Sequence, residues 1–224
     1  MALILLQARL NSSRLPEKAL LPILPGKRII DVCLSRLRRT GHKIVLCAPQ
    51  NQGFGEVALE HGVLLHEGSE DDVLARLHDA ALRYGKGEST VVRITADCPL
   101  VCTSLVLGAV HDFNASDYDY MSNAHPNRVA TRGFDIEVFS KTLLTVSHYF
   151  ACGPGEREHV TPFMYSGTLP GCRFGTLPSS ERLYFTDENL SVDTEEDYER
   201  VRKIYETIGN DMFEWSEVMR LYAN

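Results

Sequence analysis

Residues 2–18, ALILLQARLNSSRLPEK, join an apolar run to a basic segment rich in hydroxyl groups. The apolar run, residues 2–6, has the length and composition of a buried strand. The segment that follows places Arg9, Arg14 and Lys18 close together. Polar groups that follow such a strand lie at its carboxyl end, where parallel α/β sheets bind their ligands. The stretch therefore predicts an α/β fold with a ligand-binding loop after the first strand.

The first half of the chain alternates further strand-like runs with amphipathic helical patterns. Apolar runs recur at 43–48, 62–66 and 90–95, and helical patterns cover 28–40 and 69–84. This alternation predicts a mostly parallel sheet covered by helices on both faces, which is a three-layer α/β/α sandwich.

The second half is less regular and predicts a mixed sheet. Residues 117–139 suggest two strands around a polar loop. Further helices are expected at about 140–150, 155–166, 194–208 and 213–222, with extended segments over 171–192. No internal repeat or linker interrupts the sequence, so we expect a single domain over residues 1–224.

Composition excludes several classes of function. The 224 residues carry a formal net charge of −7, which disfavours a general nucleic-acid or anionic-membrane surface. The six cysteines show neither a C-x-x-C motif nor a zinc-like pairing with histidine. No basic leader or apolar run of about 20 residues is present. We therefore expect a reduced, cytoplasmic protein that binds neither nucleic acid nor membranes.

The loop after the first strand has the chemistry of a triphosphate site. Arg9 and Arg14 could each bind phosphate oxygens through a planar fork, and Lys18 could act as a point charge. The hydroxyls of Ser12 and Ser13 could donate hydrogen bonds. Neither G-x-x-x-x-G-K-[ST] nor G-x-G-x-x-G is present, which excludes the two most familiar nucleotide motifs. A loop whose charges are merely solvated is the competing interpretation.

Residues 7–37, QARLNSSRLPEKALLPILPGKRIIDVCLSRL, resemble the N-terminal signature of the sugar-activating cytidylyltransferases. That family includes the CMP-Kdo and CMP-acylneuraminate synthetases, and the resemblance is greatest to its spore-coat polysaccharide biosynthesis group. The family pattern is A-R-x-x-S-[ST]-R-L-P-x-K, with a second Gly-Lys before the first long helix. Asn11 and Glu17 depart from it, because glycine is common at both positions.

Later blocks resemble the same group in the same order, so the similarity extends from residue 2 to about residue 208. These blocks are HEGSEDDVLARLHDAA (66–81), VVRITADCPL (91–100), DYMSN (119–123), RGFDIEVF (132–139), EREHVTPFMY (156–165) and LSVDTEEDYERVRKIYE (190–206). The resemblance implies a nucleotide-diphospho-sugar transferase-like fold, CTP as a substrate, Mg²⁺ as a cofactor and a homodimer. It also implies that residues 117–180 form the acceptor and dimerisation part.

The resemblance assigns roles to residues of this chain. The catalytic residues are Arg9, Lys18 and Asp97, and Mg²⁺ is held by Asp97 and Asp193. The nucleotide contacts are Ala8, Arg9, Ser12, Ser13, Arg14, Lys18, Arg76 and Thr95. The acceptor contacts are Asn123, His125, Arg132, Asp135, Glu137, Arg157 and His159.

Local patterns offer competing structural roles for several of these residues. Asp97 could be an ordinary turn residue, and Asp193 could cap the helix that follows it. The acids at 70–72 are better explained as a capping box that begins at Ser69 than as a metal site. Arg76 could form an intrahelical pair with Asp72. Arg157 and His159 could belong to a solvated helix face.

Together these features predict nucleotidyl transfer in surface polysaccharide biosynthesis. An oxygen of an acidic or phosphorylated sugar-type acceptor would attack the α-phosphorus of CTP in line, and pyrophosphate would leave. One alternative is a metal-dependent glycosyltransferase that uses the D-x-D motif Asp117-Tyr118-Asp119. Another is a non-catalytic, nucleotide-binding partner in a polysaccharide pathway.

Overall fold

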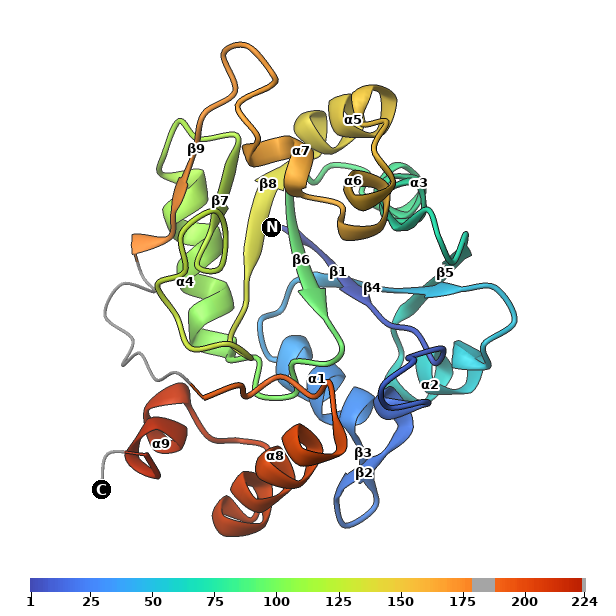
Figure 1. The fold of residues 1–224 in the computed structure, drawn as a ribbon, viewed down its shortest axis with the longest axis vertical. Helices are drawn as coiled ribbons and strands as arrows, with labels where there is room; N and C mark the ends of the chain where they lie inside the picture. Colours follow the sequence, from blue (N-terminus) through green and yellow to red (C-terminus); the bar gives the residue numbers. More distant parts are fainter. Residues whose placement is uncertain (179–187, 223–224) are drawn as a thin grey trace.

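A computed structural model describes residues 1–178 and 188–222, which build a mixed seven-stranded sheet in the order β5-β4-β1-β6-β8-β7-β9 (Figure 1). Strands β5, β4, β1 and β6 run parallel, β8 is antiparallel to both β6 and β7, and β9 is parallel to β7. The strands are β1 (Leu3–Gln7), β4 (Lys43–Pro49), β5 (Leu64–Gly68), β6 (Thr90–Thr95), β7 (Tyr120–Ser122), β8 (Glu137–Ser140) and β9 (Phe174–Thr176). The expectation of a mostly parallel, mixed sheet is confirmed.

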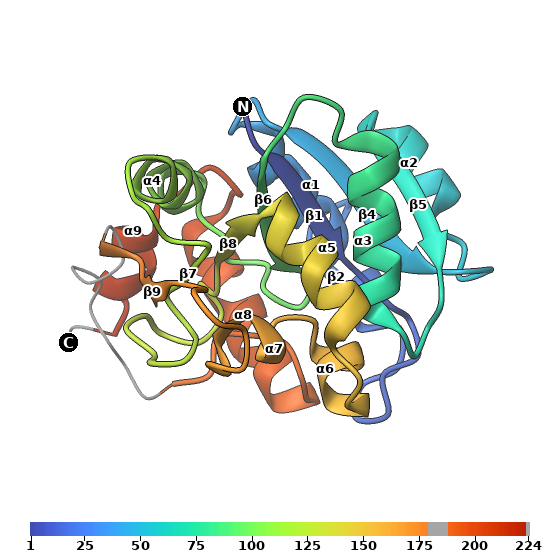
Figure 2. The same cartoon turned by 90° about the horizontal axis from the view of Figure 1, so that it is seen from above.

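Helices cover both faces of this sheet (Figure 2). Along β1, Ile4 and Leu6 enter one core and Leu3 and Leu5 enter the other, as the two-residue period of a strand requires. The first core is covered by α1 (Ile29–Arg38), α2 (Phe54–His61), α4 (Thr103–Asn114), α8 (Glu195–Ile208) and α9 (Trp215–Arg220). The second is covered by α3 (Val73–Tyr84), α5 (Lys141–Phe150), α6 (Pro154–His159) and α7 (Pro162–Tyr165). The three-layer sandwich is therefore confirmed.

Helix boundaries differ from the sequence expectation at two places. Helix α3 begins at Val73, because Asp72 is the residue whose side chain accepts from the backbone of the first turn, through Ala75 N. The Ser69 hydroxyl instead accepts from Asp72 N, one turn before the helix. The helix expected at 155–166 is divided into α6 and α7, because Val160 adopts a positive φ of 73°.

Two helices and a hairpin have no counterpart in the sequence expectation. Helix α2 has eight residues and is bounded by two glycines in left-handed conformation, so it is too short to show a clear period. Helix α4 follows apolar residues 98–102 directly, so no change in the sequence pattern marks where the helix begins. The hairpin comprises β2 (Pro22–Leu24) and β3 (Lys27–Arg28). Part of the extended chain expected over 171–192, residues 179–187, lies outside the described residues, as do the final two residues of the expected domain.

The chain order of the strands creates a crevice beside β1. From β1 the chain passes through α1 to β4 on one side, whereas β6 pairs with β1 on the other side. The strand order therefore reverses at β1, and Gln7 and Thr95 are paired at the ends of the two strands that meet there. Ligands of open α/β sheets bind at such a switch point. Among the described residues, no helix combines the length and apolar character that crossing a bilayer requires.

Candidate functional site

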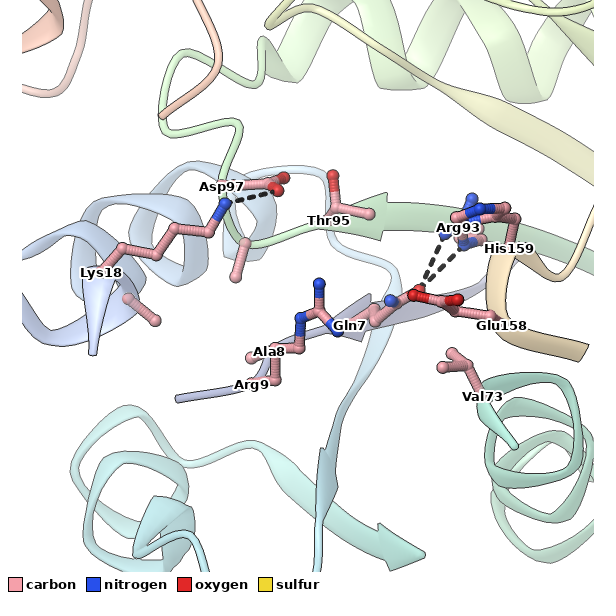
Figure 3. Close-up of a pocket in the computed structure, with 12 residues that line it drawn as sticks. Gln7, Ala8, Arg9, Lys18, Val73, Arg93, Thr95, Asp97, Glu158 and His159 are labelled. Carbon is pink, nitrogen blue, oxygen red and sulfur yellow. Dashed lines mark hydrogen bonds and ion pairs between the residues drawn. The ribbon is translucent and has the colours of Figure 1, made fainter. Parts of the chain in front are cut away.

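Two adjoining pockets, with volumes of about 190 and 490 Å³, form one cleft at the carboxyl ends of β1 and β6. They share Arg93, Thr95, Asp97 and His159. Figure 3 shows Lys18 and Asp97 at one end of the smaller pocket and Arg93 and His159 at the other. The smaller pocket is further lined by Gln7, Ala8, Arg9, Lys18, Ala19, Val73, Ala96 and Glu158. The larger is further lined by Cys98, Ala124, His125, Arg132, Asp135, Glu137, Thr161, Pro162, Tyr165, Ser191 and Asp193.

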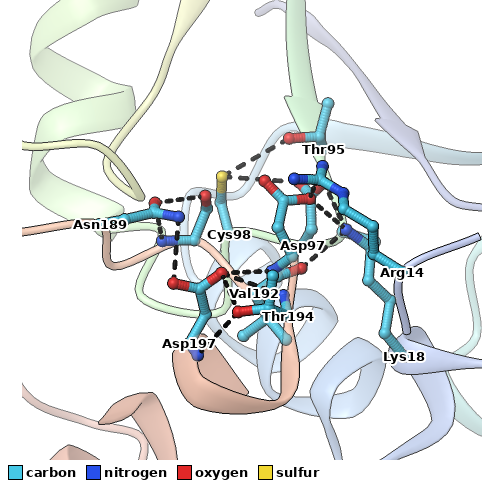
Figure 4. Close-up of polar contacts among 12 residues, drawn as sticks. Arg14, Lys18, Thr95, Asp97, Cys98, Asn189, Val192, Thr194 and Asp197 are labelled. Atoms are coloured by element: carbon cyan, nitrogen blue, oxygen red, sulfur yellow. Dashed lines mark hydrogen bonds and ion pairs between the residues drawn. The ribbon is translucent and has the colours of Figure 1, made fainter. Parts of the chain in front are cut away.

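The ammonium group of Lys18 contacts both acids that were expected to bind metal. Figure 4 shows Lys18 beside Asp97 and Val192. Lys18 begins the short 3₁₀ helix η1 (Lys18–Leu20), and its side chain is buried. Its Nζ donates to Asp97 Oδ2 at 3.0 Å, to Asp193 Oδ1 at 2.9 Å and to the Val192 carbonyl at 2.7 Å. A lysine ammonium has three donors. All three of them are therefore used within the protein.

Backbone contacts fix the segment that carries Asp193. The Val192 N–H donates to the Asp97 carbonyl at 2.7 Å, which attaches this segment to the loop after β6. Two residues earlier, the Leu190 N–H donates to the Arg132 carbonyl at 2.9 Å. Gly133 has a φ of 106°, and a Cβ atom placed on it would lie 2.4 Å from the Leu190 carbonyl carbon. The register of Asp193 therefore depends on two hydrogen bonds and on the close approach of a glycine.

Asp193 does not cap α8. Thr194 is the N-cap residue: its Oγ1 accepts from Asp197 N, and Asp197 Oδ2 accepts from Thr194 N. The carboxylate of Asp193 instead contacts Lys18 and Arg14. The capping alternative for Asp193 is therefore wrong, and its carboxylate faces the cleft.

Lys18 and Asp97 have shifted pKa values. Burial would raise the pKa of Asp97, but the positive charge of Lys18 and a hydrogen bond from Thr95 lower it below its usual range. Burial would likewise lower the pKa of Lys18, but Asp97 and Asp193 raise it above its ordinary value. Both shifts favour the charged forms. At neutral pH Asp97 is therefore a carboxylate and Lys18 an ammonium.

The acid pair has the donor chemistry of a magnesium site. Asp97 and Asp193 are both within 3.0 Å of one nitrogen, and their side chains remain 29% and 24% exposed. Mg²⁺ usually takes one or two protein carboxylates, together with phosphate oxygens and waters. Within residues 1–178 and 188–222, no cluster of three or more His, Cys, Asp or Glu residues has a metal-binding arrangement. These two carboxylates fit a metal ion whose remaining ligands are phosphate oxygens and waters.

Two exposed arginines border this cluster. Arg14 lies 3.2 Å from Asp193, and its side chain is 64% exposed. Arg9 lines the smaller pocket, directly after β1. Ala8 and Thr95 also line that pocket, as expected. The structure therefore brings Arg9, Arg14, Lys18, Thr95 and both acids to one part of the crevice.

The expected nucleotide contacts at Ser12 and Ser13 lie elsewhere. They line a separate open pocket beside the loop that precedes α2, together with Asn51, Gln52 and Glu70. Glu17 adopts φ 55°, a left-handed conformation that explains why glycine suits this position. The Glu17 N–H donates to the Leu10 carbonyl and closes the loop at its base. Neither serine lines the two pockets of the cleft.

Arg76 is buried behind the cleft and does not line it. Its guanidinium donates to the Ser69 carbonyl, and its side chain packs against Gly68. The pKa of Arg76 is lowered, chiefly by burial and also by the nearby charges of Arg9 and Arg93. It forms no pair with Asp72, which binds Arg157 instead. Arg76 therefore neither lines the cleft nor forms the expected pair with Asp72.

The larger pocket is organised around Glu137. Its carboxylate accepts from Arg93, from the hydroxyl of Tyr120 at 2.8 Å and from the hydroxyl of Thr161. Burial would raise the pKa of Glu137, but Arg93 and these hydroxyls lower it. The expected acceptor residue Glu137 is thus placed in the pocket wall as a buried anion.

The other expected acceptor residues divide into two groups. His125, Arg132, Asp135 and His159 line the larger pocket. His125 is stacked on Tyr165 with ring centroids 5.5 Å apart, and Asp135 forms a bidentate pair with Arg128 at 2.7 and 2.9 Å. Arg132 is exposed and, within the described part of the chain, has no ion-pair partner. It is therefore the cation in this pocket that is most available to a ligand.

Asn123 and Arg157 do not line the cleft. The buried amide of Asn123 donates to the Phe134 carbonyl and accepts from Ile136 N. Arg157 donates to the His148 carbonyl at 2.6 Å and to Asp72 at 2.5 Å, so it connects α6 with α5 and α3. In the structure both residues stabilise the surrounding fold and do not face the cleft, which differs from their expected role as acceptor contacts.

The D-x-D motif is remote from the cleft. Asp117 is 87% exposed and lies 3.5 Å from Arg173, and Asp119 accepts from Arg173 N. Neither acid lines the two pockets of the cleft. The motif stabilises the turn before β7 and gives no support to the glycosyltransferase alternative.

Several residues of the cleft were not anticipated from the sequence. Gln7 accepts two hydrogen bonds from Arg93, and Glu158, Thr161, Tyr165 and Ser191 line the walls. A polar Gln7 at the end of the apolar first strand is a signal that could have identified one of them. The others come from short helices and coil, where no period indicates which side chains turn inward.

Comparisons with known proteins agree with this architecture. A family model described as cytidylyltransferase matches residues 3–217. The chain is 30% identical over 220 residues to the spore coat polysaccharide biosynthesis protein SpsF of Bacillus subtilis, covering 92% of this chain and 87% of that protein.

Solved structures show the same arrangement. A cytidylyltransferase from Leptospira borgpetersenii superposes with a TM-score of 0.86 at 29% identity, over 99% of this chain and 93% of that one. A CMP:2-keto-3-deoxy-manno-octonic acid synthetase complexed with CTP has a TM-score of 0.69 at 15% identity, over 92% and 99% of the two chains. The second similarity shows the fold alone.

Proposed function

Because this chain belongs to the cytidylyltransferase family, we propose that it transfers CMP from CTP to an acidic or phosphorylated sugar-type acceptor and releases pyrophosphate. The observation that carries the proposal is the meeting of Lys18, Asp97 and Asp193 at the carboxyl ends of β1 and β6. The printed name of the relative SpsF, a spore coat polysaccharide biosynthesis protein, supports the polysaccharide pathway and with it a sugar-type acceptor.

In this proposal the smaller pocket binds the nucleotide. Arg9 and Arg14 neutralise charge on the triphosphate as pyrophosphate departs. Asp97 and Asp193 would hold Mg²⁺, and the metal would supply polarisation of the phosphoryl oxygens. Ala8 is buried at the end of β1 and Thr95 is only partly exposed at the end of β6, so both restrict the space beside the triphosphate.

The larger pocket binds the acceptor. Arg132 pairs with an acidic group of the acceptor, since Arg93, the other arginine of that pocket, is already engaged by Glu137. The acceptor oxygen is positioned for in-line attack on the α-phosphorus, and no covalent enzyme intermediate is required. Catalysis then rests on positioning and on electrostatic stabilisation of reactants held in one cleft.

The test is an assay of pyrophosphate release. Purified protein is incubated with each of four nucleoside triphosphates and a library of 2-keto-3-deoxy sugars and sugar phosphates, with Mg²⁺ or with a chelator. Pyrophosphate release that requires CTP, Mg²⁺ and one class of acceptor is expected. Nucleotide binding without turnover over the whole library would instead indicate the non-catalytic partner.

A matched pair of variants separates the metal site proposed here from the D-x-D motif. Asp97→Asn is expected to lower turnover by at least about 100-fold, because it removes a ligand of the metal. Asp117→Asn changes an exposed acid outside the cleft and is expected to leave turnover unchanged. The opposite pattern, with a nucleoside diphosphate as the product, would indicate a glycosyltransferase.

The proposal also includes a cytoplasmic homodimer whose acceptor and dimerisation part lies within residues 117–180. Light scattering of the purified protein at several concentrations measures the oligomeric state. A monomer that retains full turnover would remove the dimer from the proposal.

A further inference from the structure

The ammonium of Lys18 occupies the space between the two carboxylates that the proposed function assigns to Mg²⁺. We propose that Lys18 is an internal counter-cation of the metal-free enzyme, and that a divalent cation must displace it in order to bind Asp97 and Asp193. This inference rests on the proposed role of these acids as magnesium ligands. It concerns the step before nucleotide chemistry, and the contacts of Lys18 carry it.

The first observation in support is that the Lys18 ammonium uses all three of its donors within the protein. Nζ has three acceptors at 2.7 to 3.0 Å, and the Lys18 residue is only 7% exposed. No N–H remains in this arrangement to bind a phosphate oxygen. A phosphate contact from Lys18 therefore requires that at least one carboxylate releases it.

The second support is charge. Two carboxylates that approach one point repel each other unless a cation lies between them. Lys18 supplies that cation from inside the protein, whereas Arg14 contacts only Asp193 from the exposed rim. A divalent ion that takes the same oxygens would lie against the ammonium, so both cations cannot keep these contacts together.

The third support is the geometry available to the displaced group. Lys18 has a flexible four-carbon stem, and its residue lines the smaller pocket beside Arg9. The Val192 carbonyl is a neutral acceptor that the ammonium can retain when it leaves the acids. Displacement would thus direct the ammonium into the pocket proposed for the triphosphate, so that metal entry makes Lys18 available to phosphate.

The direct test is binding of Mn²⁺ to nucleotide-free protein, measured from the signal of free Mn²⁺ in electron paramagnetic resonance. Lys18→Met removes the internal cation and retains a long side chain, and it is expected to bind Mn²⁺ at least tenfold more tightly than the parent protein. Arg14→Met is the matched control and is expected to change the affinity less than threefold. Equal or weaker binding by Lys18→Met, or no binding by either protein, would overturn the inference.

A second measurement on the parent protein covers the case in which Lys18→Met does not fold. Lysines are acetylated briefly with a water-soluble reagent, and the modified sites are quantified by mass spectrometry with and without Mg²⁺. Acetylation of Lys18 is expected to rise severalfold with Mg²⁺, while Lys43, which is paired with Glu88, stays constant. Unchanged acetylation of Lys18 at a saturating metal concentration contradicts displacement.

These measurements separate the inference from the proposed function. A protein that shows displacement of Lys18 but releases no pyrophosphate from any nucleotide would refute the function and retain the inference. A protein that releases pyrophosphate from CTP with Mg²⁺, but whose Lys18→Met variant binds Mn²⁺ no more tightly, would retain the function and refute the inference.

Discussion

Gly133 approaches Leu190 so closely that a Cβ atom on Gly133 would lie 2.4 Å from the Leu190 carbonyl carbon. This contact joins the loop that carries Arg132 to the segment that carries Asp193. Only glycine fits at position 133, because a Cβ atom there would meet backbone atoms that cannot rotate away and because φ is 106°. The acceptor wall and the acid pair are therefore held against each other by a glycine.

Gly133→Ala is expected to lower both stability and turnover. The added methyl group must push the Leu190 segment outward, which moves Asp193 away from Lys18. The measurements are thermal unfolding and pyrophosphate release. Gly167→Ala is the control, because Gly167 also has a positive φ, 76°, but has open space around its Cβ position. That control should lose only about 1–2 kcal/mol and retain turnover, and equal losses in both variants would contradict the positioning role.

Arg9→Met is expected to reduce turnover without unfolding the protein. The side chain is exposed at the pocket, so its loss removes phosphate stabilisation and little packing. A fall in turnover of about 100-fold is expected, which corresponds to one lost charge-stabilising donor. Arg38→Met, at the exposed end of α1, is the control. Steady-state kinetics and thermal unfolding decide the matter, and a folded Arg9→Met protein with a normal rate would remove Arg9 from the mechanism.

The stability contributed by Asp97 is expected to disappear in acid. The folded-state pKa of Asp97 is below the unfolded value of about 3.9, so its contribution is present above that pH and is lost as pH falls through the folded pKa. The free energy of unfolding of the parent protein should therefore exceed that of Asp97→Asn at pH 7, and the difference should shrink below about pH 4. Urea unfolding of the two proteins over this pH range measures the difference.

The stability contributed by Lys18 is expected to disappear in alkali rather than in acid. The folded-state pKa of Lys18 is above its unfolded value of about 10.4, so its contribution is complete below that pH and is lost as pH rises through the folded pKa. The same urea series, extended to alkaline pH with Lys18→Met, checks this sign. A difference between the two proteins that grows with pH would contradict it.

Arg132→Ala is expected to raise KM for the acceptor with little change in KM for CTP. Arg132 is an exposed cation of the larger pocket, so its loss weakens binding of an acidic acceptor group and leaves the phosphate side intact. Arg128→Ala is the comparison, since Arg128 is already held by Asp135. Equal effects of Arg132→Ala on both substrates would argue against a separate acceptor wall.

Glu137→Gln is expected to destabilise the protein by about 3–5 kcal/mol, because it leaves the largely buried Arg93 without its anion. A double-mutant cycle with Arg93→Met measures the pairwise energy. Urea unfolding of the four proteins provides the data. Additive effects of the two substitutions would show that the pair is not energetically coupled.

Much of the architecture was predictable because it depends on local periodicity. The strands near residues 2–6, 43–48, 62–66 and 90–95 appear within one or two residues of their expected ends. The position of Asp97 followed from its place directly after an apolar strand. These features are encoded over short stretches of chain, where composition and spacing reflect burial directly.

Long-range contacts were not predictable in the same way. Lys18 and Asp193 are 175 residues apart in sequence and 2.9 Å apart in the structure. No local pattern indicates that the lysine would contact the acids rather than solvent or phosphate. Arg157 was expected to contact the acceptor, but it instead contacts Asp72 at the start of α3 and His148 on α5. Ser12 and Ser13 line a separate pocket beside the loop before α2, and no local pattern in the sequence indicates that placement.

The distance between Lys18 and Asp193 along the chain has a consequence for how the protein is made. Asp193 leaves the ribosome after β1, β4, β5 and β6 have all been synthesised, so the central strands can pair before the second acid exists. A nascent or truncated chain that ends before residue 188 lacks Asp193 and cannot assemble the complete acid pair. The contacts of Lys18 with both acids therefore form only after the segment that carries Asp193 has been synthesised.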